Sequence, residues 1–531
     1  MIKPVGRSEP TVETLWAFAI AILLSLGGLL LRPLMPVDET RYLTVAWEMW
    51  QRGDFLVPHL NGVPYDHKPP LLFWAIHGIW ALFGVSETAG RLTPPLFTLA
   101  TIALVGPLAA MLWPGRADVA ARARLILATF GLFALFGSLV MFDAALSATV
   151  VLALVGLVRA WRRPGWLGWL LLALGLGLGG LAKGPVVLVH VMPVAVLAPL
   201  WQGAADGGHW RRWYGGLAVA LLGGALIALA WAVPAALAGG ERYAAEILWS
   251  QTADRMVNAI AHPRPWWFYF WILPLAVLPW IVWDRVWRGL GHLRRDGADP
   301  GLRLVAVWAL SALIGLVVIS GKQAHYLLPV LPALALIAAR ASLAETEAPA
   351  GRIWLGRGPV LLVGLIGLAG AVIGLVPGAT LAGRVDPGVG LALAALAGAG
   401  LVVWRRPTVL LVAAVTPLLL LGGLVAARDL MPAYDLKPLA GRLAGQDGDI
   451  AMLGRYRGEF GFLARLTRPV ETLLFNADVE AWLKQHPNGL VVARFDPGAA
   501  PIPRPPAYAQ AYRGRRIGIW TADPHLAEAG S

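Results

Sequence analysis

Residues 15–42 read "LWAFAIAILLSLGGLLLRPLMPVDETRY". The apolar part, 15–34, matches the roughly 20 helical residues that are needed to cross the hydrocarbon core of a bilayer. Polar side chains follow at once, among them Asp38, Arg41 and Tyr42. The stretch therefore predicts a membrane-spanning helix that leads directly into a group of side chains able to do chemistry.

The rest of the chain repeats the apolar pattern. Of its 531 residues, 58% are hydrophobic and 14% are charged, and the mean hydropathy is +0.65. This composition is typical of a polytopic α-helical membrane protein and excludes an ordinary soluble domain. By the same length criterion we expect about thirteen transmembrane helices, at 15–34, 92–113, 124–141, 145–161, 166–182, 185–201, 215–238, 267–287, 303–320, 326–340, 359–376, 388–404 and 407–426.

The chain is strongly basic, with a formal net charge of +13 and a pI near 10.4. Its arginines gather in alternate short loops, as expected of cytoplasmic loops, so the charge predicts membrane topology and no nucleic-acid partner. With the N-terminus inside and an odd number of spans, the C-terminal part lies in the periplasm of a bacterial cell, outside the inner membrane. The chain has no cysteine, which excludes disulfides and thiolate metal sites.

Two domains are expected, a transmembrane domain at 1–427 and a small periplasmic α/β domain at 428–531. The first periplasmic loop, 35–91, carries two Trp-rich amphipathic stretches, 39–52 and 71–83. Such helices lie in the membrane interface, so we expect juxtamembrane helices there.

The C-terminal domain is predicted from a change in the sequence pattern. The stretches "GDIAMLG", "PVETLLF" and "GLVVARF" indicate strands, and "ADVEAWLKQH" indicates a helix. The segment "DPGAAPIPRPP" is a Pro-rich connection.

Two acids on the outer face are candidate catalytic residues. Asp38 precedes Arg41 and Tyr42 at helical spacing. It either caps a helix and forms an exposed salt bridge, or faces a cavity in which Arg41 holds it or a phosphate. Asp143 lies in "LVMFDAALSATVVLAL", with no charged residue beside it. Ionisable groups at membrane depth usually face a cavity or a partner, although Asp143 also fits a helix cap.

Basic residues from distant loops emerge on the same predicted face. Lys68 precedes two prolines that hold the backbone extended, so its ammonium can lie over an anion or extend toward lipid headgroups. Further basic groups are Lys183, Arg255, Arg264 and Lys322. Together such groups can hold a lipid phosphate beside the carboxylates.

A metal site is a further alternative, because His67 and His262 both lie in outer loops and imidazoles bind zinc. No short ligand spacing supports it. The sequence has no P-loop, dinucleotide-binding, HExxH or GxSxG motif. The absence of these motifs argues against a cytosolic nucleotide-driven reaction, and a polyprenyl-phosphate-linked donor that has already crossed the membrane fits the pattern.

The motifs "DETRY", "GDFLVPHLNGVPYDHKPPLLFW", "LAKGP" and "KQAHYLLPVLPALAL", together with the isolated Asp143, resemble the aminoarabinose (lipid A) transferases. These are membrane glycosyltransferases of the GT-C superfamily, which includes protein O-mannosyltransferases. The resemblance covers most of the first 340 residues.

The resemblance implies roles for particular residues. It places the family's two acids at Asp38 and Asp143 and its phosphate-binding lysine at Lys68. The remaining donor-site positions fall on Arg41, Tyr42, Tyr65, Lys183, Arg255, Lys322 and Tyr326. Relatives often carry a carboxylate where this chain has His67, which leaves a metal role for that position open.

The implied reaction is an inverting transfer of a sugar from polyprenyl phosphate to an envelope acceptor, lipid A or lipopolysaccharide core. The donor sugar stays open, since aminoarabinose and a uronic acid both occur among relatives. A protein O-glycosyltransferase is the alternative within the superfamily. A lipid-linked sugar transporter or flippase is the alternative outside it, and predicts paired charges deep in several spans.

Overall fold

The computed structural model describes residues 10–203, 207–247, 264–296, 299–344, 358–375, 387–403, 414, 416–417, 420–425, 428–502 and 504–522. Its described residues form two compact units. The first lies within Met1–Gly28, His67–Leu72 and Leu92–Ala426, and the second within Leu29–Asp66, Phe73–Arg91 and Ala427–Ser531.

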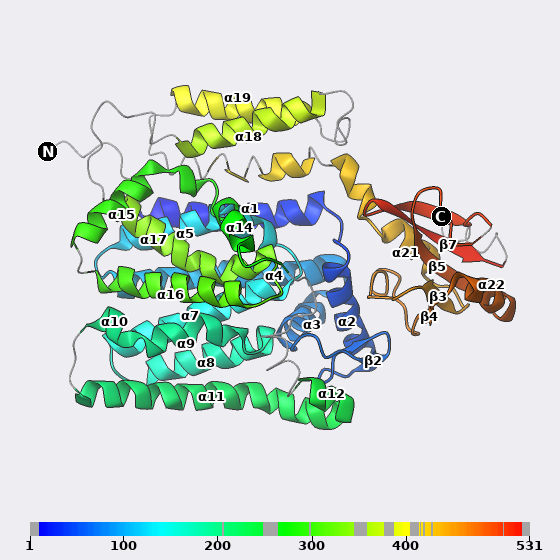
Figure 1. Ribbon diagram of the computed structural model, residues 1–531, viewed down its shortest axis with the longest axis horizontal. Helices are drawn as coiled ribbons and strands as arrows, with labels where there is room; N and C mark the ends of the chain where they lie inside the picture. Colours follow the sequence, from blue (N-terminus) through cyan, green and yellow to red (C-terminus); the bar gives the residue numbers. More distant parts are fainter. Residues whose placement is uncertain are drawn as a thin grey trace. The chain divides into compact units, whose positions relative to one another are not determined.

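The first unit is helical. Its described helices are α1 (Pro10–Leu31, which ends in the second unit), α4 (Glu87–Leu112, which begins there), α5 (Ala117–Thr129), α6 (Gly131–Phe136), α7 (Phe142–Arg162), α8 (Trp166–Lys183), α9 (Val186–Val196), α10 (Ala198–Gln202), α11 (Gly207–Gly239), α12 (Glu241–Ala245), α14 (Phe268–Ala276), α15 (Asp284–Asp296), α16 (Pro300–Val318), α17 (Leu331–Ser342), α18 (Gly358–Leu375) and α19 (Pro387–Val403). Short 3₁₀ segments, η2 (Trp280–Val282) and η3 (Ala324–Val330), join some of them. Several of these helices, including α7, α8, α9, α11 and α16, run side by side (Figure 1).

Small residues let two of these helices approach closely. A Cβ built at Gly168 of α8 would lie 2.5 Å from the backbone nitrogen of Ala160 on α7, and one at Gly175 would lie 2.4 Å from that of Ala153. Larger side chains at these glycines would therefore push α8 away from α7, as in other membrane helix pairs built on small residues.

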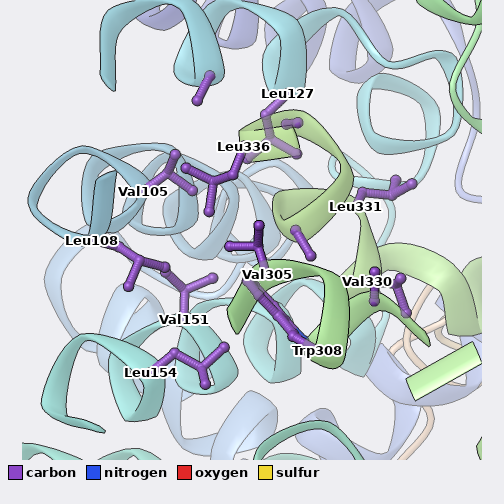
Figure 2. Close-up of a cluster of buried hydrophobic side chains, with 14 of the residues drawn as sticks. Val105, Leu108, Leu127, Val151, Leu154, Val305, Trp308, Val330, Leu331 and Leu336 are labelled. Atoms are coloured by element: carbon purple, nitrogen blue, oxygen red, sulfur yellow. The ribbon is translucent and has the colours of Figure 1, made fainter. Parts of the chain in front are cut away.

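The centre of the helical unit is apolar. Val105, Val151, Val305 and Trp308 are fully buried and converge from three helices, α4, α7 and α16 (Figure 2). Because lipid is as apolar as these side chains, close packing is what holds the bundle together.

Seven of the described helices are long and apolar enough to cross a membrane, and shorter apolar helices accompany them. The predicted spans near 124–141, 185–201 and 267–287 are each divided between shorter elements. Proline accounts for two of the interruptions, since Pro193 lies near the end of α9 and Pro274 near the end of α14. The predicted number of about thirteen spans therefore stays a prediction.

The second unit contains the two predicted amphipathic helices of the first loop, α2 (Asp38–Arg52) and most of α3 (Leu71–Phe83). A short antiparallel pair, β1 (His59–Leu60) and β2 (Val63–Pro64), lies between them in the chain. On α2, Leu43 and Ala46 are fully buried, as expected for the apolar face of an amphipathic helix.

The same unit contains a five-stranded sheet in the order β4-β3-β5-β7-β6. Its strands are β3 (Ile450–Leu453), β4 (Glu471–Leu473), β5 (Leu490–Phe495), β6 (Tyr508–Tyr512) and β7 (Arg515–Thr521). The pairs β3–β4 and β3–β5 are parallel, and β5–β7 and β6–β7 are antiparallel. Helix α22 (Asn476–Gln485) lies beside this sheet, and η5 (Arg428–Ala433) and α21 (Lys437–Leu443) precede it in the chain (Figure 1).

Both faces of the sheet are covered, and the alternation of side chains shows it. Met452 and Val492 pack with α21 in one buried cluster. Ala451 and Val491 point to the other face and pack with Trp482 of α22. A period of two along each strand therefore supplies two small cores.

The predicted strands in "GDIAMLG", "PVETLLF" and "GLVVARF" coincide with β3, β4 and β5, and the predicted helix coincides with α22. Strands β6 and β7 had no prediction. Their turn contains Arg513 and Gly514, both with positive φ, at 50° and 83°. Arginine is rare in that conformation, so the usual Asn-Gly signal of a two-residue hairpin is missing.

Candidate active site

An acid and a base from neighbouring helices meet in the helical unit. Asp143 is the second residue of α7 and Lys183 the last of α8, and Lys183 Nζ donates a hydrogen bond of 2.6 Å to Asp143 Oδ1. An acid at a helix start and a base at a helix end both interact favourably with the helix dipoles. Gly184, with φ of 69°, ends α8 directly after the lysine. The close packing of α7 against α8 therefore brings two charges together across neighbouring helix ends.

Three more groups surround this pair. His325 of η3 places Nε2 3.8 Å from Asp143 Oδ2, and the Tyr326 ring lies 4.1 Å from Lys183 Nζ. Lys68 lies with its Nζ 5.8 Å from the Phe142 ring and acts electrostatically on Asp143. We call Lys68, Asp143, Lys183, His325 and Tyr326 the acid–base cluster.

Asp143 does not cap helix α7, so the alternative role predicted for it is wrong. The N-cap of α7 is Met141, and no side chain caps it. Asp143 is 2% exposed and its carboxylate faces the lysine and the histidine. A buried carboxylate in this setting needs such partners, because an unpaired buried charge is costly.

The second unit brings together the predicted residues of the first loop. Asp38 is the first residue of α2, whose N-cap is Val37 without a side-chain bond. Arg41 donates a hydrogen bond of 2.8 Å to Asp38 Oδ1, and its guanidinium lies 5.8 Å from the Tyr42 ring. Arg41 also interacts with the buried Tyr65. The interpretation of Asp38 as a helix cap is therefore wrong, and the ion pair with Arg41 is present.

Burial and neighbouring charges shift the pKa values of Tyr65 and Arg41. Burial raises the pKa of Tyr65 to about 12, although the charge of Arg41 opposes that shift. Burial alone would lower the pKa of Arg41, but Tyr65, Tyr42, Asp38 and Glu459 raise it above its usual value. At neutral pH, Tyr65 is a neutral phenol and Arg41 a cation.

A segment of the C-terminal part packs directly on α2. Thr44 Oγ1 donates to Gly458 O at 3.1 Å and accepts from Phe462 N at 3.0 Å, and Trp47 Nε1 donates to Leu466 O at 2.9 Å. Gly458 has φ of 80°, and a Cβ there would lie 3.1 Å from the Cα of Arg41. We call residues 455–468 the brace segment.

The brace segment contributes a buried acid that the sequence did not point to. Glu459 is fully buried, accepts from Arg457 N at 2.7 Å and from Arg494 Nη1 at 3.2 Å, and acts electrostatically on Arg41. His325 was also missed. Its only signal was its position beside Tyr326 in "KQAHY".

The remaining predicted residues have other positions. The Lys322 ammonium donates to the backbone carbonyls of Ile319 and Arg264. Arg255 and His262 lie outside the described residues. Among the described residues no group of three or more potential metal ligands occurs, so a metal role for His67 with His262 stays a prediction.

Comparisons with known proteins find a family model and curated relatives that match this chain. The family model for dolichyl-phosphate-mannose-protein mannosyltransferases matches residues 67–237. An undecaprenyl phosphate-alpha-4-amino-4-deoxy-L-arabinose arabinosyl transferase of Pseudomonas paraeruginosa is 33% identical over 382 residues, 70% of this chain and 67% of its own length. The protein of the same name from Serratia proteamaculans is 31% identical over 363 residues, 66% of this chain and 62% of its own.

Solved structures share the fold. ArnT from Cupriavidus metallidurans bound to undecaprenyl phosphate has a TM-score of 0.75 at 18% identity, over 96% of this chain and 98% of its own. Its apo form has a TM-score of 0.76 at 19% identity, over 98% and 99% of the two chains. The predicted GT-C-type helical membrane fold with a small C-terminal sheet domain is thereby confirmed.

The Pseudomonas paraeruginosa relative is 33% identical, and the match covers 67% of that relative's length. The chain therefore belongs to the family of undecaprenyl phosphate-alpha-4-amino-4-deoxy-L-arabinose arabinosyl transferases, which are membrane-bound glycosyltransferases.

Proposed function

We propose that the enzyme transfers 4-amino-4-deoxy-L-arabinose from undecaprenyl phosphate to lipid A, with inversion, at the periplasmic face of the bacterial inner membrane. The names of the relatives support the donor. The arginines in alternate short loops support the orientation, since such loops face the cytoplasm.

The observation that carries the proposal is the acid–base cluster. The buried carboxylate of Asp143 lies 2.6 Å from Lys183 Nζ and 3.8 Å from His325 Nε2, and Lys68 acts on it electrostatically. A sugar phosphate donor brings an anion and several hydroxyls to its site. Lysine suits the phosphate and the carboxylate suits the sugar, so this mixture of charges matches both halves of the donor.

In the proposed reaction, an acceptor oxygen forms a bond to the anomeric carbon as the bond from that carbon to the donor phosphate breaks. The electron pair of the broken bond leaves with undecaprenyl phosphate. Lys68 stabilises this leaving phosphate as its negative charge grows. A lipid A phosphate is already anionic and needs no base, so Asp38 then orients the acceptor or the sugar.

A protein acceptor is a second candidate, and the match to the protein mannosyltransferase model over residues 67–237 supports it. A serine or threonine hydroxyl must lose a proton as it attacks. In that case Asp38 acts as the general base.

The test is transfer in proteoliposomes that contain the full chain, undecaprenyl phosphate-aminoarabinose and either lipid A or a Ser/Thr-rich peptide, with products measured by mass spectrometry. We expect the wild type to modify lipid A, and Asp38→Asn or Asp143→Asn to abolish transfer. Asp284→Asn is the matched control, because Asp284 forms a 2.8 Å pair with Arg288 on α15. Transfer to the peptide alone, or full activity of either test variant, would overturn the corresponding part of the proposal.

A further inference from the structure

The second unit contains a cavity whose lining includes none of the residues to which the proposed reaction assigns a role. Its volume is about 690 Å³, within the range of about 300–1,000 Å³ that is usual for small-ligand sites. Four segments line it: the end of α1, the start of α4, residues 428–438 and strand β6. Neither Asp38, Arg41 nor Tyr65 is among the lining residues.

One part of the lining is cationic. Arg32, Arg91, Arg428 and Lys437 line the cavity together with only two carboxylates, Glu87 and Asp435. The lining side chains therefore carry more positive than negative charge.

The cations fall into two kinds. Arg32 and Arg91 are buried and held in place, Arg32 by Glu39 and Arg91 by Glu87 at 3.0 Å. The side chains of Lys437 and Arg428 are 54% and 66% exposed. Glu87 serves two of these cations, because Lys437 also lies 3.0 Å from it. Arg91 and Lys437 therefore share the single negative charge of Glu87, and an anion that enters the cavity can bind to both cations.

The carboxylate of Asp435 is already engaged with the backbone. Its Oδ1 accepts from Lys437 N at 2.9 Å. Because this oxygen already accepts a backbone hydrogen bond, its negative charge is partly compensated within the protein. The balance of the lining thus favours an anion with several acceptor oxygens, as in phosphate.

The other part of the lining is apolar. Leu29, Leu30 and Leu31 form the last turn of α1, and Pro33, Met431, Pro432 and Pro438 continue this surface. Helix α1 is apolar enough to cross a membrane, and Leu30 is 80% exposed. Exposed leucines on such a helix are surfaces for acyl chains. A free anion would use the cations and leave these leucines without a partner.

We infer that this cavity binds the phosphorylated headgroup of an anionic membrane lipid, with its acyl chains along the end of α1. Basic pockets beside membrane helices bind lipid headgroups in this way. A phospholipid and a phosphorylated glycolipid such as lipid A share this chemistry. The inference does not depend on the transfer reaction, because binding is measured without turnover.

The experiment measures how much lipid stays bound to the full-length protein, by native mass spectrometry after release from nanodiscs. One set of nanodiscs contains phosphatidylcholine with phosphatidylglycerol, and the other contains phosphatidylcholine with lipid A. The test variant is Arg428→Gln/Lys437→Gln, both on exposed side chains. The control is Arg468→Gln/Arg515→Gln, which removes the same charge from exposed side chains outside the cavity, where each arginine pairs at 3.1 Å with an aspartate.

We expect the test variant to retain anionic lipid roughly thirty-fold less well than the wild type, from about 1 kcal/mol for each basic residue at a membrane surface. The control should retain it as the wild type does. Stronger retention of one lipid in the paired nanodiscs identifies the source of the phosphate. Unchanged retention by the test variant, or complete displacement of lipid by millimolar inorganic phosphate, would overturn the inference.

Discussion

Replacing Lys183 by methionine removes the closest partner of a buried carboxylate. The pair is short, at 2.6 Å, and the two side chains are only 11% and 3% exposed. Breaking a buried ion pair by removing one partner typically costs about 3–5 kcal/mol, because the other charge is left uncompensated. Asp143 keeps His325 at 3.8 Å and the field of Lys68, so we expect the lower end, about 3 kcal/mol.

The expected change in melting temperature follows from the size of the chain. Unfolding entropies of soluble domains scale to roughly 1 kcal/mol per kelvin for a chain of this length, so Lys183→Met should lower the midpoint by about 3 °C. In Lys183→Met/Asp143→Asn the stranded charge is absent, and the midpoint should recover part of the loss. The measurement is thermal unfolding in detergent by intrinsic fluorescence, with all variants scanned at one rate.

The double variant decides the outcome. An ion pair predicts that the effects of the two substitutions are not additive, with a coupling of about 1–3 kcal/mol. If the double variant is destabilised by the sum of the two single variants, Asp143 and Lys183 do not stabilise each other and the reasoning fails. The same holds if Lys183→Met unfolds at the wild-type temperature.

Three further predictions concern other parts of the molecule. Lys68→Ala should bind undecaprenyl phosphate more weakly by about tenfold, measured by microscale thermophoresis; Lys484→Ala is the control, and equal affinity would remove the phosphate role of Lys68. Burial raises the pKa of Glu48, so its contribution to stability is present below pH 4.5 and is lost as pH rises through the higher folded pKa. Relative to the wild type, Glu48→Gln should therefore become more stable as pH increases above 4.5, and a difference in melting temperature that does not change with pH would contradict this. Thr44→Val removes two hydrogen bonds to the brace segment and should cost about 1–3 kcal/mol, seen as faster proteolysis within 455–468; a cleavage rate equal to that of the wild type would argue against this contact.

The helical fold and part of the site could be predicted from the sequence because they depend on local signals. An isolated acid in an apolar stretch identified Asp143, and the predicted span 166–182 ends one residue before Lys183, the last residue of α8. Both signals concern single helices. Their contact at 2.6 Å depends on small residues along the α7–α8 interface, whose pairing the sequence does not state.

Contacts between distant segments could not be predicted. His325 and Lys322 lie in the same short motif, so the local sequence does not distinguish their roles. In the structure His325 faces Asp143, whereas Lys322 donates to backbone carbonyls. Glu459 looks like an ordinary surface acid in "RYRGEFGF", yet it is buried with Arg494. The amphipathic pattern of α2 predicted an interfacial helix, but did not reveal that Trp47 bonds to the brace segment.

The bond from Thr44 to Gly458 joins residues 414 positions apart in the chain. During synthesis the ribosome completes α2 long before it reaches this glycine. Until then, the helix that carries Asp38 and Arg41 lacks the segment that packs on it in the finished protein. A chain that ends before residue 455 would therefore leave the helix that carries Asp38 and Arg41 without this packing partner.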